Sequence, residues 1–88
     1  MNYTPYNWVV LEFEGGTHRK VLAGFGGSEW RLNSGIEHTA DMGDHYVFYG
    51  YSGSTYTCYK NREGMSMFMQ DLLAYWQHKG VPAAVVHV

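Results

Sequence analysis

The chain has only one cysteine, Cys58, so no disulfide bond can form within it and a disulfide-built secreted scaffold is excluded. No segment approaches the run of about 18 apolar residues that a membrane-spanning helix needs. The first residues, 1–6, include neither a basic cluster nor an apolar run, so they do not fit a secretory signal peptide. From these absences we expect a cytoplasmic protein that does not cross a membrane.

Basic residues are also few. Six Lys and Arg against eight Asp and Glu give a formal net charge of −2. Proteins that bind duplex nucleic acid are usually strongly basic, because neutralising phosphates provides most of their affinity. The chain lacks this property. Its negative charge gathers before His45, at Glu37, Asp41 and Asp44, where we expect either a solvated loop or a contact with a basic partner surface.

Aromatic residues are the abundant class, at 17% of the 88 residues. Each aromatic side chain buries roughly 150–250 Å², which lets a short chain build a compact core. Aromatic residues also anchor binding surfaces. The length fits a single domain, residues 1–88, and the apolar fraction of 45% is that of an ordinary globular chain.

Alternating patterns and β-forming residues predict five strands, over residues 7–14, 18–25, 29–36, 45–51 and 54–60. The Gly15-Gly16 pair predicts a tight hairpin turn between the first two strands. Residues 37–44 are interpreted as a polar loop. The short connections are typical of an antiparallel meander, so we expect one antiparallel sheet of about five strands.

Residues 64–79 have the apolar period of an amphipathic helix. The apolar stripe consists of Met65, Phe68, Met69, Leu72, Leu73 and Trp76. Asn61 is the predicted N-terminal cap, and Gly80 ends the helix. The expected fold class is therefore α+β, with the sheet packed on one C-terminal helix. Residues 83–88 are compatible with a short final strand.

Three surfaces are candidates for partner binding. The first is the Tyr-rich pair of strands, because one helix covers only one face of a sheet and some rings must face solvent, a second layer or a partner. The second is the acidic loop, and the third is the weakly charged outer side of the helix. The candidate contact residues are Tyr49, Tyr51 and Tyr59 on the strands, Glu37, Asp41 and Asp44 in the loop, and Met67 on the helix.

The tyrosines have alternative interpretations. Aromatic rings on an exposed sheet can stack the bases of a single-stranded nucleic acid, with Arg31, Lys60 and Arg62 as contacts to phosphates. The same rings can close a homodimer, or stabilise the sheet through cross-strand pairs without binding anything. The sequence leaves these alternatives open.

No motif identifies a reaction or a cofactor. His38, Asp41, Asp44 and His45 are residue types that bind Zn²⁺, but their spacing matches no established metal loop. Cys58 has neither a base nor a cation beside it in the sequence to lower its pKa. We therefore expect no enzyme, no metal site and no cofactor.

Two segments carry a resemblance. Residues 30–36, and residues 49–54 followed by Tyr56, Cys58 and Lys60, resemble a group of small phage-encoded accessory proteins. The similarity covers about residues 20–70 and rests on the placement of Gly, Ser and aromatic residues. The resemblance implies a non-enzymatic protein that binds and blocks a host protein in the host cytoplasm, as inhibitors of host defence such as anti-CRISPR proteins do.

Overall fold

The computed structural model describes residues 1–13 and 18–88, so the predicted Gly15-Gly16 turn and Glu14 lie outside the described residues. Within these ranges the chain forms strands, one 3₁₀ turn and one α-helix. The elements are β1 (Asn2–Tyr3), β2 (Asn7–Glu12), β3 (Arg19–Gly24), β4 (Trp30–Leu32), β5 (Ile36–Asp41), β6 (His45–Gly50), β7 (Thr55–Tyr59), η2 (Lys60–Arg62), α1 (Met67–His78) and β8 (Ala84–Val86).

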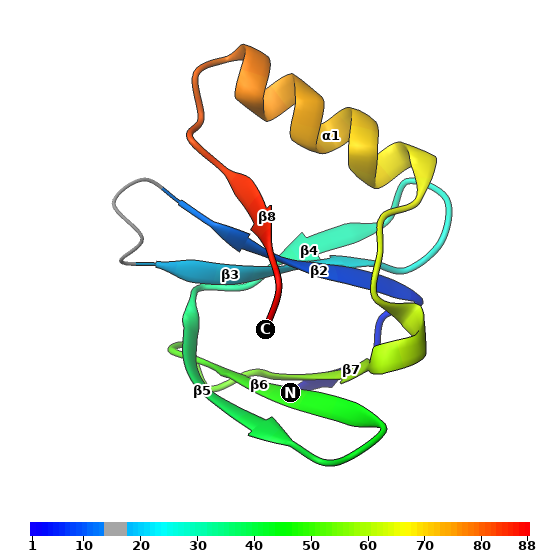
Figure 1. The fold of residues 1–88 in the computed structure, drawn as a ribbon, viewed down its shortest axis with the longest axis vertical. Helices are drawn as coiled ribbons and strands as arrows, with labels where there is room; N and C mark the ends of the chain where they lie inside the picture. The colour runs from blue at the N-terminus through cyan, green and yellow to red at the C-terminus, as the bar shows by residue number, and fades with distance from the viewer. Residues whose placement is uncertain (14–17) are drawn as a thin grey trace.

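The described elements are arranged in three layers, which Figure 1 shows from top to bottom as α1, a middle sheet and an outer sheet. The middle sheet has the strand order β4-β3-β2-β8, and the outer sheet has the order β1-β7-β6-β5. The predicted α+β class, with antiparallel strands and a C-terminal helix, is confirmed. The prediction of one five-stranded sheet is wrong, because two sheets of four strands form instead.

The reason for two sheets is visible in β2, whose side chains are buried on both faces. Val9 and Leu11 pack in the core under α1, whereas Trp8 and Val10 pack in a second core between the sheets. Each strand sends alternate side chains to opposite faces, so a strand that is apolar in both sets needs a cover on both sides. The helix supplies one cover, and the outer sheet supplies the other.

Trp8 joins the layers at the centre of the molecule. Its ring is fully buried and packs against Phe48 and Tyr46 of the outer sheet. Its indole Nε1–H donates a hydrogen bond to the carbonyl of Tyr59 at the end of β7, over 2.7 Å. One side chain of the middle sheet therefore fixes the position of the outer sheet.

The predicted polar loop over residues 37–44 is also wrong, because residues 36–41 form β5 and pair antiparallel with β6. Only residues 42–44 remain as the connection, closed by the Met42 N–H donating to the His45 carbonyl over 2.8 Å. The polar composition is tolerated because β5 is an edge strand of the outer sheet. Pairing with the strongly β-forming β6 outweighs the weak strand propensity of β5 itself.

The helix begins later than the apolar period indicates. Ser66 is the N-terminal cap, and its side chain accepts a hydrogen bond from the Met69 N–H. Gly64 has a φ of +144°, outside the helical region, and the predicted cap Asn61 lies in η2. Met69 of the stripe packs directly over β3, where a Cβ at Gly24 would lie 2.5 Å from the methionine sulfur.

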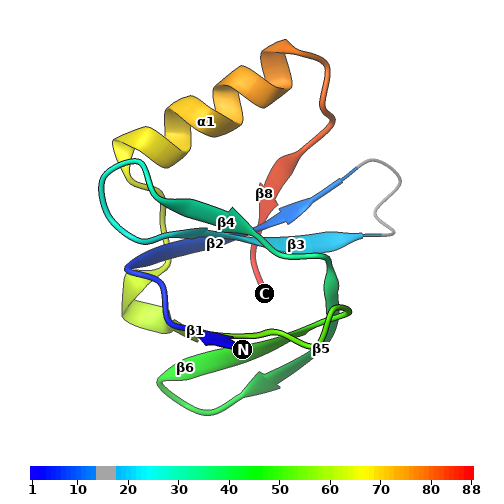
Figure 2. The ribbon, with the colours of Figure 1, turned by 180° about the vertical axis from the view of Figure 1, so that it is seen from behind.

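The sheets are completed by strands from the two ends of the described chain. β8 pairs antiparallel with β2, with Val86 opposite Val10, which confirms the predicted short final strand. β1 pairs parallel with β7, and no sequence pattern indicated this two-residue strand. Figure 2 shows β1 on the layer of β6 and β5, below β4 of the middle sheet. In the described ranges no helix is long and apolar enough to cross a membrane.

The two segments that carry the resemblance meet where the chain passes from the middle to the outer sheet. The Tyr51 N–H donates to the Gly35 carbonyl over 3.1 Å, and the Ser52 N–H donates to Ser34 Oγ over 3.1 Å. Next to them, the buried Asn33 side chain accepts a hydrogen bond from the Val21 N–H. These Gly, Ser and Asn residues have a structural role at the junction of the sheets.

Candidate functional site

The tyrosines of β6, β7 and their connecting turn divide between the two sides of the outer sheet. Tyr46 and Tyr56 pack toward the core between the sheets. Tyr49 and Tyr59 lie on the opposite side, 39% and 36% exposed, and Tyr51 in the turn after β6 is 63% exposed. This division follows the two-residue period of a strand, so the three tyrosines predicted as contact residues are the exposed ones.

The exposed side of the outer sheet is an uncharged surface that we call the His–Tyr face. Cross-strand pairing places His38 opposite Tyr49 and His45 opposite Tyr59, with ring centroids 5.5 and 5.2 Å apart. Between these two pairs, Val47 of β6 lies opposite Ala40 of β5 and Thr57 of β7. The residues of the face are His38, Ala40, His45, Val47, Tyr49, Thr55, Thr57 and Tyr59.

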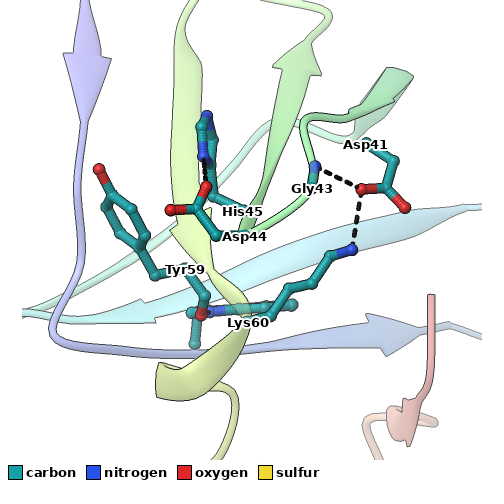
Figure 3. Close-up of polar contacts among 7 residues, drawn as sticks. Asp41, Gly43, Asp44, His45, Tyr59 and Lys60 are labelled. Carbon is teal, nitrogen blue, oxygen red and sulfur yellow. Dashed lines mark hydrogen bonds and ion pairs between the residues drawn. The ribbon is translucent and has the colours of Figure 1, made fainter.

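The polar groups on this face are held by local hydrogen bonds. Asn2 Oδ1 of β1 accepts from the hydroxyls of Thr55 and Thr57, over 2.8 and 3.1 Å. His45 Nδ1 lies 2.6 Å from Asp44 Oδ1, so the imidazole N–H donates to the carboxylate and the ring orientation is fixed. Figure 3 shows His45 and Asp44 beside the ring of Tyr59. The face is therefore ordered before any partner arrives.

Asp41 forms an ion pair at the corner of the outer sheet (Figure 3). Its Oδ1 accepts from Lys60 Nζ over 2.8 Å and from the Gly43 N–H over 3.0 Å. The hydrogen bond from Lys60 and that from Gly43 lower the pKa of the Asp41 carboxyl, and the same contact raises the pKa of Lys60. The charge of Asp41 is thus matched by the first residue of η2, which directly follows β7.

The three acidic residues predicted as one partner-binding loop do not form one patch. Glu37 and Asp41 lie at opposite ends of β5, about 13 Å apart along the strand. Asp41 is paired with Lys60, and Asp44 contacts His45 with its carboxylate largely exposed. Because residues 36–41 form the extended strand β5, Glu37 and Asp41 lie apart. No residue pattern in the sequence indicated the contact between Asp41 and Lys60.

Of the four residues considered for a metal site, Asp41, Asp44 and His45 lie at the hairpin between β5 and β6, whereas His38 lies apart from them. His38 pairs with Tyr49 and His45 with Tyr59, at opposite ends of the His–Tyr face. In residues 1–13 and 18–88 no group of three or more His, Cys, Asp or Glu side chains is placed to hold a metal ion. Asp41 is instead bound to Lys60.

Cys58 is fully buried in the core between the sheets. Burial raises the pKa of its thiol to about 12, because the charged thiolate would lose its hydration. The thiol is therefore protonated near neutral pH, and a protonated, buried sulfur cannot attack a substrate.

The cations considered as phosphate contacts lie away from the His–Tyr face. Arg31 stacks over the ring of Tyr3, with its guanidinium carbon 4.3 Å from the ring centroid. Lys60 pairs with Asp41, and Arg62 donates to the Tyr6 carbonyl over 3.5 Å. These three cations therefore have other partners and are not placed as the phosphate contacts of a nucleic-acid platform at the exposed tyrosines.

The outer side of α1 is a second exposed surface. Met67 is 74% exposed near the start of the helix, and Tyr75 is exposed two turns later. Lys79 lies over the ring of Tyr75, with its Nζ 5.6 Å from the centroid. The outward position predicted for Met67 agrees with this placement.

An open hollow of about 460 Å³ lies at the edge of the middle sheet, and the sequence did not indicate it. Its lining residues are Tyr3, Phe25, Ser28, Glu29, Trp30 and Arg31. They come from β1, the turn after β3, and β4. The parallel pairing of β1 with β7 brings Tyr3 to this place, and that pairing has no signal in residues 1–6.

Comparison of the chain with protein-family models, with curated proteins and with solved structures gave no match. The case for a function therefore depends on the surfaces of the chain itself. Among these, the His–Tyr face combines exposed aromatic rings, ordered polar groups and no Lys, Arg, Asp or Glu in its cross-strand pairs.

Proposed function

We propose that the chain is a non-enzymatic binding protein that contacts a partner protein through the His–Tyr face. The observation that carries this proposal is that Tyr49 and Tyr59 remain exposed beside His38 and His45, on a sheet face that the helix does not cover. The single helix packs on the middle sheet instead. An aromatic, uncharged face left open in this way fits the composition of a protein–protein interface core.

The physical argument concerns the cost of binding. Tyrosine gives a large contact area for few rotatable bonds, and binding hot spots are enriched in it. The rings of Tyr49 and Tyr59 already rest against histidines, and Asn2 orders the threonines between them. Less conformational entropy is lost on association when the contact groups are ordered in advance.

The resemblance to phage-encoded accessory proteins supports a host protein as the partner, with binding in the host cytoplasm. On this proposal the chain acts by occlusion: the face covers a surface that the host protein needs. Glu37 and the exposed carboxylate of Asp44 border the face and would steer association with a basic surface.

A capture experiment tests the proposal. Tagged wild-type protein, a Tyr49→Ser/Tyr59→Ser double variant and a Tyr75→Ser control are incubated with bacterial lysate, and retained proteins are identified by mass spectrometry. Loss of one hot-spot tyrosine costs about 2 kcal/mol, which is about 30-fold in affinity, so the double variant is expected to lose at least about 30-fold in affinity for the retained protein. Tyr75→Ser, which alters an exposed tyrosine on α1, is expected to retain it.

The amount of partner protein that each variant retains decides between the outcomes. Equal retention by the double variant and the wild type would show that the His–Tyr face is not the contact. A concentration-dependent dimer in sedimentation experiments, abolished by the double variant, would assign the face to a second copy of the chain. Charge reversal at Glu37 and Asp44 is expected to slow association without abolishing binding.

A further inference from the structure

The edge of the middle sheet at β4 has backbone groups that point away from the sheet. β4 pairs with β3 on one side, and in the described ranges no strand pairs with its other side. Glu29 and Asn33 form backbone hydrogen bonds with residues 21–25, over 3.0 and 3.1 Å. Residues of an antiparallel strand turn their N–H and C=O groups alternately toward and away from the neighbouring strand. Trp30 and Leu32 therefore turn these groups outward, where another strand can pair with them.

The side chains of this edge alternate between the two faces of the sheet. Trp30 faces α1 and rests on Trp76, with ring centroids 5.3 Å apart. Arg31 faces the outer sheet, with its guanidinium carbon 4.3 Å from the ring centroid of Tyr3. Glu29 precedes Arg31 by two residues, so the period of a strand places both side chains on the same face. Figure 2 shows β4 below α1 and above β1.

Glu29 and Arg31 are exposed charges of opposite sign on either side of Trp30. In the described ranges neither of them takes part in an ion pair with another residue. A second copy of the strand, paired antiparallel, presents the same residues in reverse order. The charge pattern is therefore complementary to itself, as a two-fold symmetric interface requires.

The backbone and the charges agree on one register for such a pair. If the two-fold axis passes beside Trp30, the two Trp30 residues exchange N–H···O=C hydrogen bonds, because both turn these groups outward. Glu29 then lies opposite Arg31 of the second copy, twice in the interface. These are the closely spaced positions of an antiparallel pair, with Cα atoms about 4.5 Å apart. Opposite charges at directly opposed positions stabilise the pairing of two strands.

Other registers of β4 lack this agreement. An axis beside Arg31 would place two arginines directly opposite each other, and like charges there oppose pairing. An axis beside Leu32 would place Arg31 opposite Asn33 and leave Glu29 without a partner. The charges therefore select the register centred on Trp30.

The longer edge strand β5 shows the contrast. Self-pairing of β5 centred on Thr39 would place Glu37 opposite Asp41, which are two acidic residues. A bulge between Ile36 and His38 also interrupts the regular ladder of this strand. Charge and geometry thus oppose self-pairing at β5 and favour it at β4.

We propose that two copies of the chain associate through β4, antiparallel and centred on Trp30, so that their middle sheets join in one continuous sheet. Two ion pairs between Glu29 and Arg31 flank the two-fold axis. The two Trp30 side chains meet on the side of α1, each supported by Trp76. The hollow beside Arg31 has room for the carboxylate of the second copy. No residue of this contact belongs to the His–Tyr face, which stays open in the dimer.

Sedimentation equilibrium at protein concentrations from about 10 µM to about 1 mM tests the dimer. We expect the wild-type chain to shift from monomer to dimer over this range, with a Kd of about 1 mM or tighter. The Tyr49→Ser/Tyr59→Ser double variant is expected to form the same dimer, because its changes lie on the His–Tyr face. A wild-type chain that stays monomeric at about 1 mM overturns the proposal.

Charge reversals test the register. Glu29→Lys and Arg31→Glu each place like charges opposite each other twice, so each is expected to weaken the dimer at least tenfold. An equimolar mixture of the two variants should form a heterodimer about as stable as the wild-type dimer, because every altered charge then faces one of opposite sign. The double variant Glu29→Lys/Arg31→Glu should dimerise by itself for the same reason. Arg19→Glu, the same charge change on β3 away from this edge, is the control with unchanged dimerisation.

Amide exchange measured by NMR tests the backbone pairing. The Trp30 amide points outward in the monomer, so its exchange should become slower as the protein concentration rises, and Arg31→Glu should remove this dependence. Three results would overturn the proposal: no recovery of the dimer in the mixture of variants, exchange of Trp30 that is independent of concentration, or a dimer that Tyr49→Ser/Tyr59→Ser abolishes and Arg31→Glu leaves intact. The last result would place the contact between copies on the His–Tyr face.

Discussion

At the scale of single residues, the environment of Cys58 leads to a pH effect on stability. Burial raises the pKa of its thiol from an ordinary value near 9.0 to about 12 in the folded chain. Between these values the unfolded chain loses the thiol proton and the folded chain keeps it. The unfolded state then binds fewer protons, so the free energy of unfolding falls as the pH rises. Below pH 9 the thiol is protonated in both states and the stabilisation is fully present.

We therefore predict that Cys58 lowers stability progressively between about pH 9 and 12, by up to roughly 1.4 kcal/mol per pH unit. Urea unfolding at pH 8 and pH 10.5 measures the change. Tyr and Lys residues titrate in the same interval, so Cys58→Ala is needed as the reference chain. Wild type is expected to lose more stability than Cys58→Ala between the two pH values, and equal losses would contradict the prediction.

The sequence predicts the environment of individual residues where a period of two applies. It assigns Tyr56 and Cys58 to one face of their strand, and both are buried in the core between the sheets. The same period separates the exposed Tyr49 and Tyr59 from Tyr46. The contacts of charged residues depend on which strands become neighbours, and alternation carries no information about that.

At the scale of elements, α1 shows what a pattern fixes and what local chemistry decides. The apolar stripe correctly predicts that Met69 and Leu73 face the sheet. The stripe extends N-terminally to Met65, but the helix begins after Ser66, because the serine side chain accepts from the Met69 N–H. A periodic pattern locates a helix face more reliably than it locates a helix end.

A pair of substitutions tests the position of the helix cap. Ser66→Ala removes the acceptor for the Met69 N–H and is expected to lower the free energy of unfolding by about 1 kcal/mol. Asn61→Ala changes the residue that the sequence favoured as the cap, which lies exposed in η2, and is expected to change stability by less than about 0.5 kcal/mol. Chemical unfolding of both variants checks the difference, and a larger loss for Asn61→Ala would place the cap there.

The strand β5 was missed for a physical reason. Its sequence, from Ile36 to Asp41, has few β-forming residues, and a bulge between Ile36 and His38 interrupts its pairing. The strand exists because β6 offers it backbone partners and because its outer residues need no burial. Strand propensity measures how a side chain fits its neighbours, so an edge strand beside a strong partner is poorly visible in its own sequence.

At the scale of the whole molecule, the three-layer order follows from the middle sheet. Val9 and Leu11 of β2 face the helix core, and Trp8 and Val10 face the core between the sheets. A strand whose side chains are apolar on both faces needs a layer packed against each face. The sequence shows this pattern in residues 8–11, but most of the cover opposite the helix comes from β5, β6 and β7, which lie 25 or more residues further along the chain, and periodicity does not pair distant segments.

The order of the layers predicts that the middle sheet and the edge strand β5 differ in local stability. Amides of β2 and β3 lie between two cores and are bonded to strands on both sides, so they can exchange with solvent only when the whole domain opens. Amides of β5 lie at an edge, under no cover on the His–Tyr side, and can exchange through local opening. We therefore expect protection in β2 and β3 to equal the global free energy of unfolding and protection in β5 to be clearly lower.

Native-state hydrogen exchange at increasing, sub-denaturing urea measures this difference. The exchange free energies of Val10 and Leu22 amides should fall with urea as steeply as global unfolding does, because the same surface becomes exposed. The Ala40 amide, which faces β6, should show a shallow dependence that meets the global line only near the unfolding midpoint. Equal slopes for β5 and β2 would mean that the outer sheet opens only with the entire domain. In that case the His–Tyr face would be as rigid as the core, and partner binding would leave the exchange of β5 unchanged.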